Sequence, residues 1–81
     1  MYNDLDRQIN DLERLYSTVT PGLDKDQVGQ LLSLMKVTRQ SAGTVFLAYE
    51  QQDWGGVLKG ESNARQVISS TRDALKAAGK Q

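Results

Sequence analysis

The chain has 81 residues, with no cysteine and no histidine, and its ten acidic residues balance ten basic ones. Without cysteine or histidine it has no disulfide and no thiolate zinc site and lacks the commonest general base, so we expect a small non-enzymatic protein without cofactor or metal. Zero net charge is a poor start for binding nucleic acid or an anionic membrane, and we expect neither a membrane nor a small-molecule substrate as a partner.

The spacing of the apolar residues is helical throughout, with no alternating strand pattern. It predicts an all-α fold, a small three-helix bundle with a long central helix, formed as a single domain over residues 1–81. The first ten residues carry acidic groups and no apolar block, so we expect no signal peptide. The expected location is cytoplasmic, and the sequence is also compatible with export that needs no signal peptide.

The first predicted helix has an apolar stripe whose members are three or four residues apart. Its members are Tyr2, Leu5, Ile9, Leu12, Tyr16 and Val19. Asn3 or Asp4 is the expected N-cap. The helix should end near Thr18, because Pro21 disfavours helical geometry at Thr20.

The start of the second helix has the clearest local pattern in the chain. Asp24 and Gln27 have the spacing of a capping box, in which each side chain bonds to the backbone N–H of the other residue. Leu23 and Val28 have the spacing of a hydrophobic staple around it. We therefore expect the central helix to begin directly after Asp24.

This central helix is apolar over a wide arc, which indicates packing against two neighbours. Its main stripe consists of Val28, Leu31, Met35, Thr38, Ala42, Val45 and Tyr49. One interpretation is a single helix from 25 to about 51; the other is a break at 41–43, with Thr44 capping a new helix. We prefer the continuous helix, because the stripe keeps its phase across Gly43.

The last helix is predicted over residues 62–78. Its apolar face consists of Ala64, Val67, Ile68, Thr71, Leu75 and Ala78. Gly79 has the place of a residue that ends a helix, and the lysines beside it suit the negative end of the helix dipole.

The start of this last helix has two possible positions. Asp53 is a good N-cap and would place Trp54 at the first helical position, whereas Asn63 and Gln66 offer a second capping box. We prefer the later start, with a loop or one short helical turn around 54–60. The reason is the helix-weakening effect of three glycines, Gly55, Gly56 and Gly60.

Trp54 is the only tryptophan, and it either closes a corner of the core or anchors a partner. We expect a mostly buried indole whose exposed edge belongs to an interface. Residues 54–56 also resemble the W-x-G turn of the WXG100 family, small secreted helical hairpins that form dimers. That motif lies near the middle of those proteins and about two thirds along this chain, so we assign no family.

The predicted helix lengths provide the main functional argument. A first helix of about 15 residues spans roughly 22 Å, whereas a continuous second helix spans roughly 40 Å. The apolar residues that it leaves uncovered must meet the last helix, the Trp54 corner or another chain. We therefore predict a protein-binding role as an adaptor, assembly factor, inhibitor or secretion-associated helical protein, with a homodimer expected. The predicted partner-binding residues are Val45, Phe46, Tyr49 and Trp54.

The alternative is a helical nucleic-acid-binding protein. Arg65, Arg72 and Lys76 share one face of the last helix, and a basic stripe on an exposed helix can contact phosphates. Asp73 beside the stripe and the zero net charge make this the less favoured hypothesis.

Overall fold

The computed structural model describes residues 2–80 and the side chains from Asp4 onward. Three α-helices follow one another, and the described residues contain no strand. They are α1 (Tyr2–Val19), α2 (Lys25–Glu50) and α3 (Trp54–Gly79), with a short 3₁₀ helix η1 (Thr20–Gly22) between the first two. The all-α three-helix prediction is confirmed.

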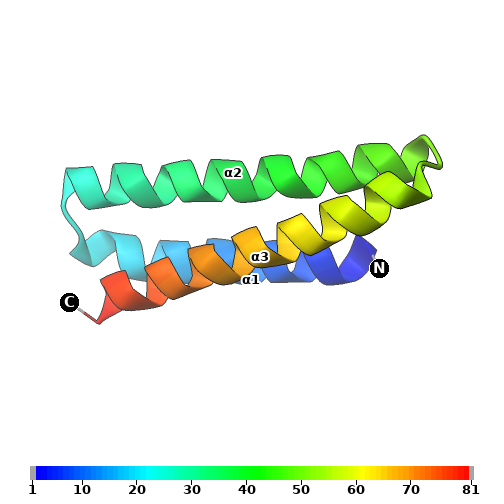
Figure 1. Cartoon of the computed structure of the whole chain (residues 1–81). Helices are drawn as coiled ribbons and strands as arrows, with labels where there is room; N and C mark the ends of the chain where they lie inside the picture. Colours follow the sequence, from blue (N-terminus) through cyan, green and yellow to red (C-terminus); the bar gives the residue numbers. More distant parts are fainter. Residues whose placement is uncertain (1, 81) are drawn as a thin grey trace.

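The helices lie side by side in an elongated bundle of 43 × 19 × 15 Å. As Figure 1 shows, α1 and α3 run in the same direction, and α2 runs against both. One end of the bundle therefore holds the start of α1 and the α2–α3 connection, and the other end holds the α1–α2 connection and the end of α3. The most extensive packing is between α2 and α3.

All three helices supply the core. Its larger fully buried side chains come from the predicted stripes, and they are Leu5, Leu12, Met35, Ile68 and Leu75, with the smaller Thr38 and Thr71 between them. The side chain of Tyr2, predicted to open the first stripe, lies outside the described side chains. Because α1 begins at Tyr2, Asp4 lies in its first turn and is not the N-cap expected from the sequence.

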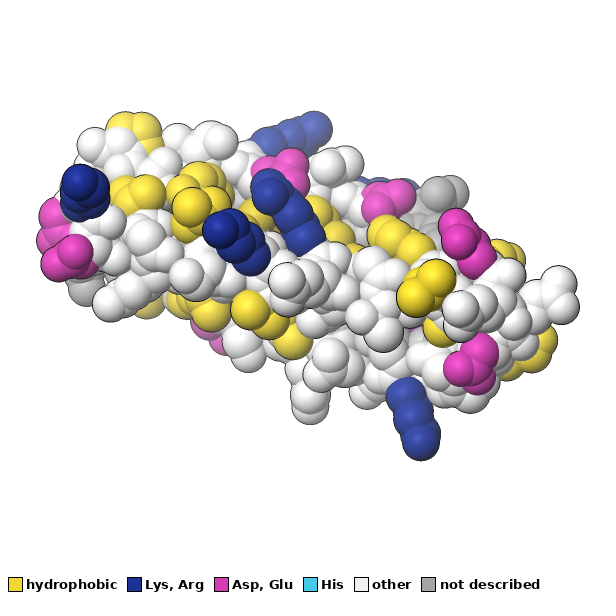
Figure 2. Space-filling view, turned by 90° about the horizontal axis from the view of Figure 1, so that it is seen from above, with side chains coloured by type: hydrophobic (Ala, Val, Ile, Leu, Met, Phe, Trp, Pro, Cys, Tyr) yellow, Lys and Arg dark blue, Asp and Glu magenta, His cyan; other side chains and the backbone are white. Residues whose placement is uncertain are grey.

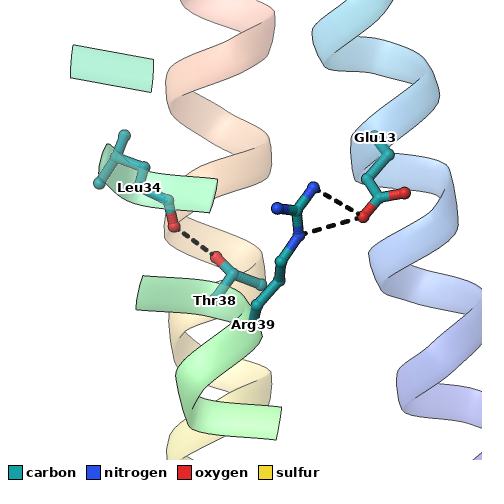
Figure 3. A network of polar contacts seen from close by, with 4 residues as sticks. All are labelled: Glu13, Leu34, Thr38 and Arg39. Atoms are coloured by element: carbon teal, nitrogen blue, oxygen red, sulfur yellow. Dashed lines mark hydrogen bonds and ion pairs between the residues drawn. The ribbon is translucent and has the colours of Figure 1, made fainter. Parts of the chain in front are cut away.

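Two threonines meet inside the α2–α3 interface. The Thr38 hydroxyl donates to the carbonyl oxygen of Leu34, one turn earlier in α2, at 2.8 Å (Figure 3). Thr38 Oγ1 also lies 3.0 Å from Thr71 Oγ1. A hydroxyl has one proton, so Thr71 is the donor of this second bond. These bonds pair both hydroxyls where water is excluded, and so remove the cost of burying them.

An ion pair joins α1 to α2 at the surface. Arg39 donates from Nε and Nη2 to the same carboxylate oxygen of Glu13, at 3.2 and 3.0 Å (Figure 3). Both side chains are about half exposed. A pair of this kind contributes about 1 kcal/mol or less, so burial of apolar side chains must supply most of the attachment of α1.

The predicted start and continuity of α2 are both confirmed. The Asp24 carboxylate accepts from Gln27 N at 2.8 Å, and the Gln27 side chain accepts from Asp24 N at 3.3 Å, which completes the capping box. The helix then runs unbroken through Gly43, where an added Cβ would meet no neighbouring atom within 4 Å. Gly43 is therefore a weak helix former that α2 tolerates on its exposed side.

The preferred start of α3 was wrong. The helix begins at Trp54 and not near residue 62, so 54–60 is regular helix. Gly60 lies against α2, because an added Cβ would come to 3.1 Å from Val45 Cγ2. This glycine allows α3 to approach α2 closely. At Gly56 an added Cβ would instead collide with the carboxylate of Asp53, at 2.5 Å, and would make only an ordinary contact with Ala48.

The end of α3 also differs from expectation by one residue. Gly79 is the last helical residue, and the C-cap is Lys80. A Cβ at Gly79 would lie 3.2 Å from Val19 Cγ2. This glycine, too, permits a close approach of two helices, here α3 and α1.

Candidate functional site

The corner between α2 and α3 is closed by three residues. Gln52 N donates to Tyr49 O at 3.0 Å, and Asp53 N donates to Ala48 O at 2.9 Å. This pair of bonds is a Schellman motif, which satisfies the last carbonyls of a helix. The residue that turns the chain is Gln52, whose φ of 57° lies in the left-handed region that usually selects glycine.

Asp53 then starts α3 at once. Its carboxylate accepts from Gly56 N at 3.1 Å, which fills the N-cap role that the sequence offered as an alternative. Trp54 is consequently the first residue of α3, directly beside the end of α2. Its ring meets the ring of Tyr49 edge-on, with centroids 5.4 Å apart and an interplanar angle of 82°.

Trp54 is more exposed than expected. Its exposed fraction is 55%, so the prediction of a mostly buried indole was wrong. The reason is the early start of α3: a tryptophan in the first turn, at the outer edge of the corner, packs against Tyr49 and does not enter the core. Its edge-on contact covers only part of the indole.

Leu58 belongs to the same surface and was missed by the sequence reading. It lies one helical turn after Trp54, which places both on one face of α3, and its exposed fraction is 69%. Tyr49 is 39% exposed. We call the surface of Tyr49, Trp54 and Leu58 the corner surface. The i, i+4 spacing of Trp54 and Leu58 would have revealed it, had the helix been expected to begin at Asp53.

The other two predicted partner-binding residues have different places. Val45 is only 4% exposed and packs in the core against Gly60, so it offers no surface to a partner. Phe46 is half-buried and packs against the core one turn before Tyr49. The apolar part of α2 that a short first helix would leave open is covered by α3, which has 26 residues, as many as α2.

Exposed acidic groups lie next to the corner surface in the chain and elsewhere at the same end of the bundle. Glu50 directly follows Tyr49 in the chain, Asp53 directly precedes Trp54, and both acidic side chains are exposed. The first turns of α1 lie at the same end of the bundle and carry the exposed Asp4 and Asp6 (Figure 1). Seen from above, acidic side chains lie among hydrophobic ones at this end, which is on the right in Figure 2.

The remaining large exposed hydrophobic side chains are spread along α2. They are Leu32, Val37 and Leu47. Leu47 follows buried Val45 by two residues, so it lies on the opposite side of the helix from the core. Figure 2 shows hydrophobic side chains separated by polar ones over much of this face. Single exposed apolar residues are normal on the surface of a folded protein, and these three do not cluster.

The basic face proposed for nucleic acid is partly neutralised. Arg65 donates to Glu61 at 2.7 Å, one turn earlier in α3. Lys76 is exposed and Arg72 is half-buried. Because one of its three cations forms an ion pair with a residue of the same helix, this face has a weaker positive charge than the sequence indicated.

Within residues 2–80, no group of three acidic side chains is arranged to hold a metal ion. None of the described helices has the length and apolar character needed to cross a bilayer. Comparison of the chain with protein-family models, with curated proteins and with solved structures gives no significant match. The corner surface is therefore the candidate functional site of the described residues.

Proposed function

We propose that this chain is a small non-enzymatic protein that binds another protein or a second copy of itself through the corner surface. The observation that carries the proposal is the exposure of Trp54 and Leu58, on one face of the first turns of α3, beside Tyr49. Tryptophan and tyrosine are enriched among the residues that contribute most to protein–protein affinity. These three large apolar side chains lie together at one corner, whereas the other exposed ones are scattered along α2.

The position of Trp54 and Leu58 supports a role in binding, because the α2–α3 connection does not need their exposed parts. The α2–α3 connection is already closed by the Schellman bonds and by the Asp53 cap. The core beneath it is filled by Ala48 and Val57, both buried. The fold therefore gains little from the exposed parts of Trp54 and Leu58, and those parts remain available to a partner.

Site-specific photo-crosslinking tests the proposal. A photoreactive phenylalanine derivative replaces Leu58 in one protein and the exposed Lys76, at the far end of α3, in a matched control. We expect crosslinked products from position 58 that position 76 does not form, and we expect Trp54→Ala to remove them. Equal products from both positions, or products that persist in Trp54→Ala, would contradict the proposal.

The fluorescence of Trp54 provides a second measurement on the unlabelled protein. Because the indole is about half exposed, its emission should be red-shifted in dilute solution. It should move to shorter wavelength when a partner, or a second copy at high concentration, covers the corner surface. Sedimentation equilibrium over the same concentrations distinguishes self-association from binding of a different protein.

A further inference from the structure

We propose that the occupant of the corner surface is an amphipathic helix of another protein, with basic residues beside its apolar face, and not a second copy of this chain. The inference rests on the proposed function. It adds the chemistry of the partner, which the charges around the corner surface indicate.

The charge at this end of the bundle is acidic although the whole chain is neutral. Residues 4–7 and 49–60 form the end where α1 starts and α2 meets α3. They carry four acidic side chains, Asp4, Asp6, Glu50 and Asp53, against two basic ones, Arg7 and Lys59. The net charge of the region is therefore −2, and all six side chains are exposed.

This charge disfavours a symmetric dimer. A twofold interface joins the same patch of two copies, so the region of net charge −2 in one copy would meet the same region in the other. Like charges placed across an interface oppose association. A basic partner instead gains attraction from the same groups, and its cations can also lie over the Trp54 ring, whose face attracts positive charge.

The shape of the surface favours a helix as the partner. Trp54 and Leu58 form an apolar ridge one helical turn long, and the edge-on Tyr49 ring borders it at the end of α2. A helix with apolar side chains at positions i, i+3 and i+4 can pack beside such a ridge, as in other helix–helix contacts. Its polar face then carries lysine or arginine toward Glu50 and the start of α1.

Two synthetic peptides test this inference directly. Both are amphipathic helices of about 18 residues, or five turns, with the same leucine and tryptophan face. The polar face of one carries lysine, and that of the other carries glutamate. Each bears a fluorescent label, and its anisotropy is measured while the full-length protein is titrated in. We expect the lysine peptide to bind about tenfold more tightly at low salt, with the difference reduced as salt rises.

Charge reversal at matched positions locates the effect. Glu50→Lys should remove most of the preference for the lysine peptide, because it reverses a charge beside the corner surface. Asp73→Lys changes the net charge by the same amount on exposed α3 surface toward the other end, and should leave the preference nearly unchanged. Trp54→Ala should weaken the binding of both peptides. If Glu50→Lys and Asp73→Lys reduce the preference for the lysine peptide equally, the net charge of the whole protein determines that preference, and not the charge beside the corner surface.

The outcomes separate the two proposals. If both peptides bind equally well through Trp54 and Leu58, the proposed function stands and the basic partner is wrong. A homodimer crosslinked from the photoreactive residue at position 58 also overturns the basic partner. If neither peptide binds and position 58 forms no specific crosslink, both proposals fail.

Discussion

The two connections of the bundle reverse the chain by different means. Between α1 and α2, Pro21 and the short helix η1 lead into the Asp24–Gln27 capping box, whose two bonds are local to the connection. Between α2 and α3, only three residues intervene, one of them left-handed Gln52. There the packing of α3 on α2 also depends on Gly60, which lies against Val45.

The two connections also differ in the role of glycine, which can weaken a helix or allow two helices to pack closely. Gly60 weakens a helix in isolation, yet α3 runs straight through it and packs closely on α2, where a larger residue would press on Val45. Gly56 is also helical, and a larger residue there would press on the capping carboxylate of Asp53. The first connection can be explained from neighbouring residues, whereas the second needs the packed pair of helices. Variants that each lack one kind of interaction therefore test this difference, and their unfolding free energies measure it.

The largest effect is expected at Gly60. Gly60→Leu would force a side chain into the space that Val45 fills, and should lower the free energy of unfolding by about 2–3 kcal/mol. Its matched control is Gly29→Leu, since a Cβ at Gly29 meets nothing within 4 Å. That variant should be neutral or slightly stabilising. Urea unfolding followed by circular dichroism measures both, and equal midpoints would refute the close-packing role of Gly60.

The parts of the fold that could be predicted are those with local causes. The apolar stripes identified the core face of each helix, and the capping box gave the start of α2 to the residue. The continuity of α2 followed from the phase of its stripe across Gly43. Each depends on residues within one or two turns of one another, so a single chain is enough to reveal them.

The start of α3 and much of the candidate site could not be predicted in this way. The sequence offers two N-cap positions for α3. Three glycines favour the later one when only helix propensity is considered, and the packing of α3 on α2 cannot be seen from the sequence. Because of the wrong start, Leu58 was not predicted as part of the site, and Trp54 was assigned to a loop or a short helical turn. Val45 was assigned to a partner surface because the sequence does not show that α3 is long enough to cover it.

The two N-caps offer a direct comparison of the connections. Asp24→Ala removes the bond from Gln27 N to the Asp24 carboxylate, leaves the bond from Asp24 N to the Gln27 side chain, and should cost about 1 kcal/mol in unfolding free energy. Asp53→Ala removes the corresponding bond from Gly56 N, which is longer at 3.1 Å, and the cost should be similar or somewhat smaller. Hydrogen exchange should show faster exchange at the first turn of the affected helix only. A protein insensitive to Asp24→Ala would show that the bond to the Asp24 carboxylate contributes nothing to stability.

Glycine-to-alanine changes separate helix propensity from packing. Gly43→Ala should stabilise the protein by about 0.5–1 kcal/mol, because alanine restricts the unfolded chain and the site has open space. Gly60→Ala gains the same propensity but brings a Cβ to 3.1 Å from Val45 Cγ2, so its net effect should be smaller or reversed. Thermal unfolding of the two variants measures the difference. Equal stabilisation would mean that α2 and α3 adjust freely.

The smallest effect is expected at Gln52, where the second connection departs most from local preference. A residue with a side chain loses free energy at φ 57°, and glycine does not. Gln52→Gly should therefore stabilise the protein by about 0.5 kcal/mol, because relief of the left-handed geometry exceeds the added entropy of the unfolded chain. The neighbouring Gln51, with φ −83°, provides the control, and Gln51→Gly should destabilise by a similar amount. Unfolding midpoints that move in the same direction for both variants would show that the left-handed turn carries no strain that glycine can relieve.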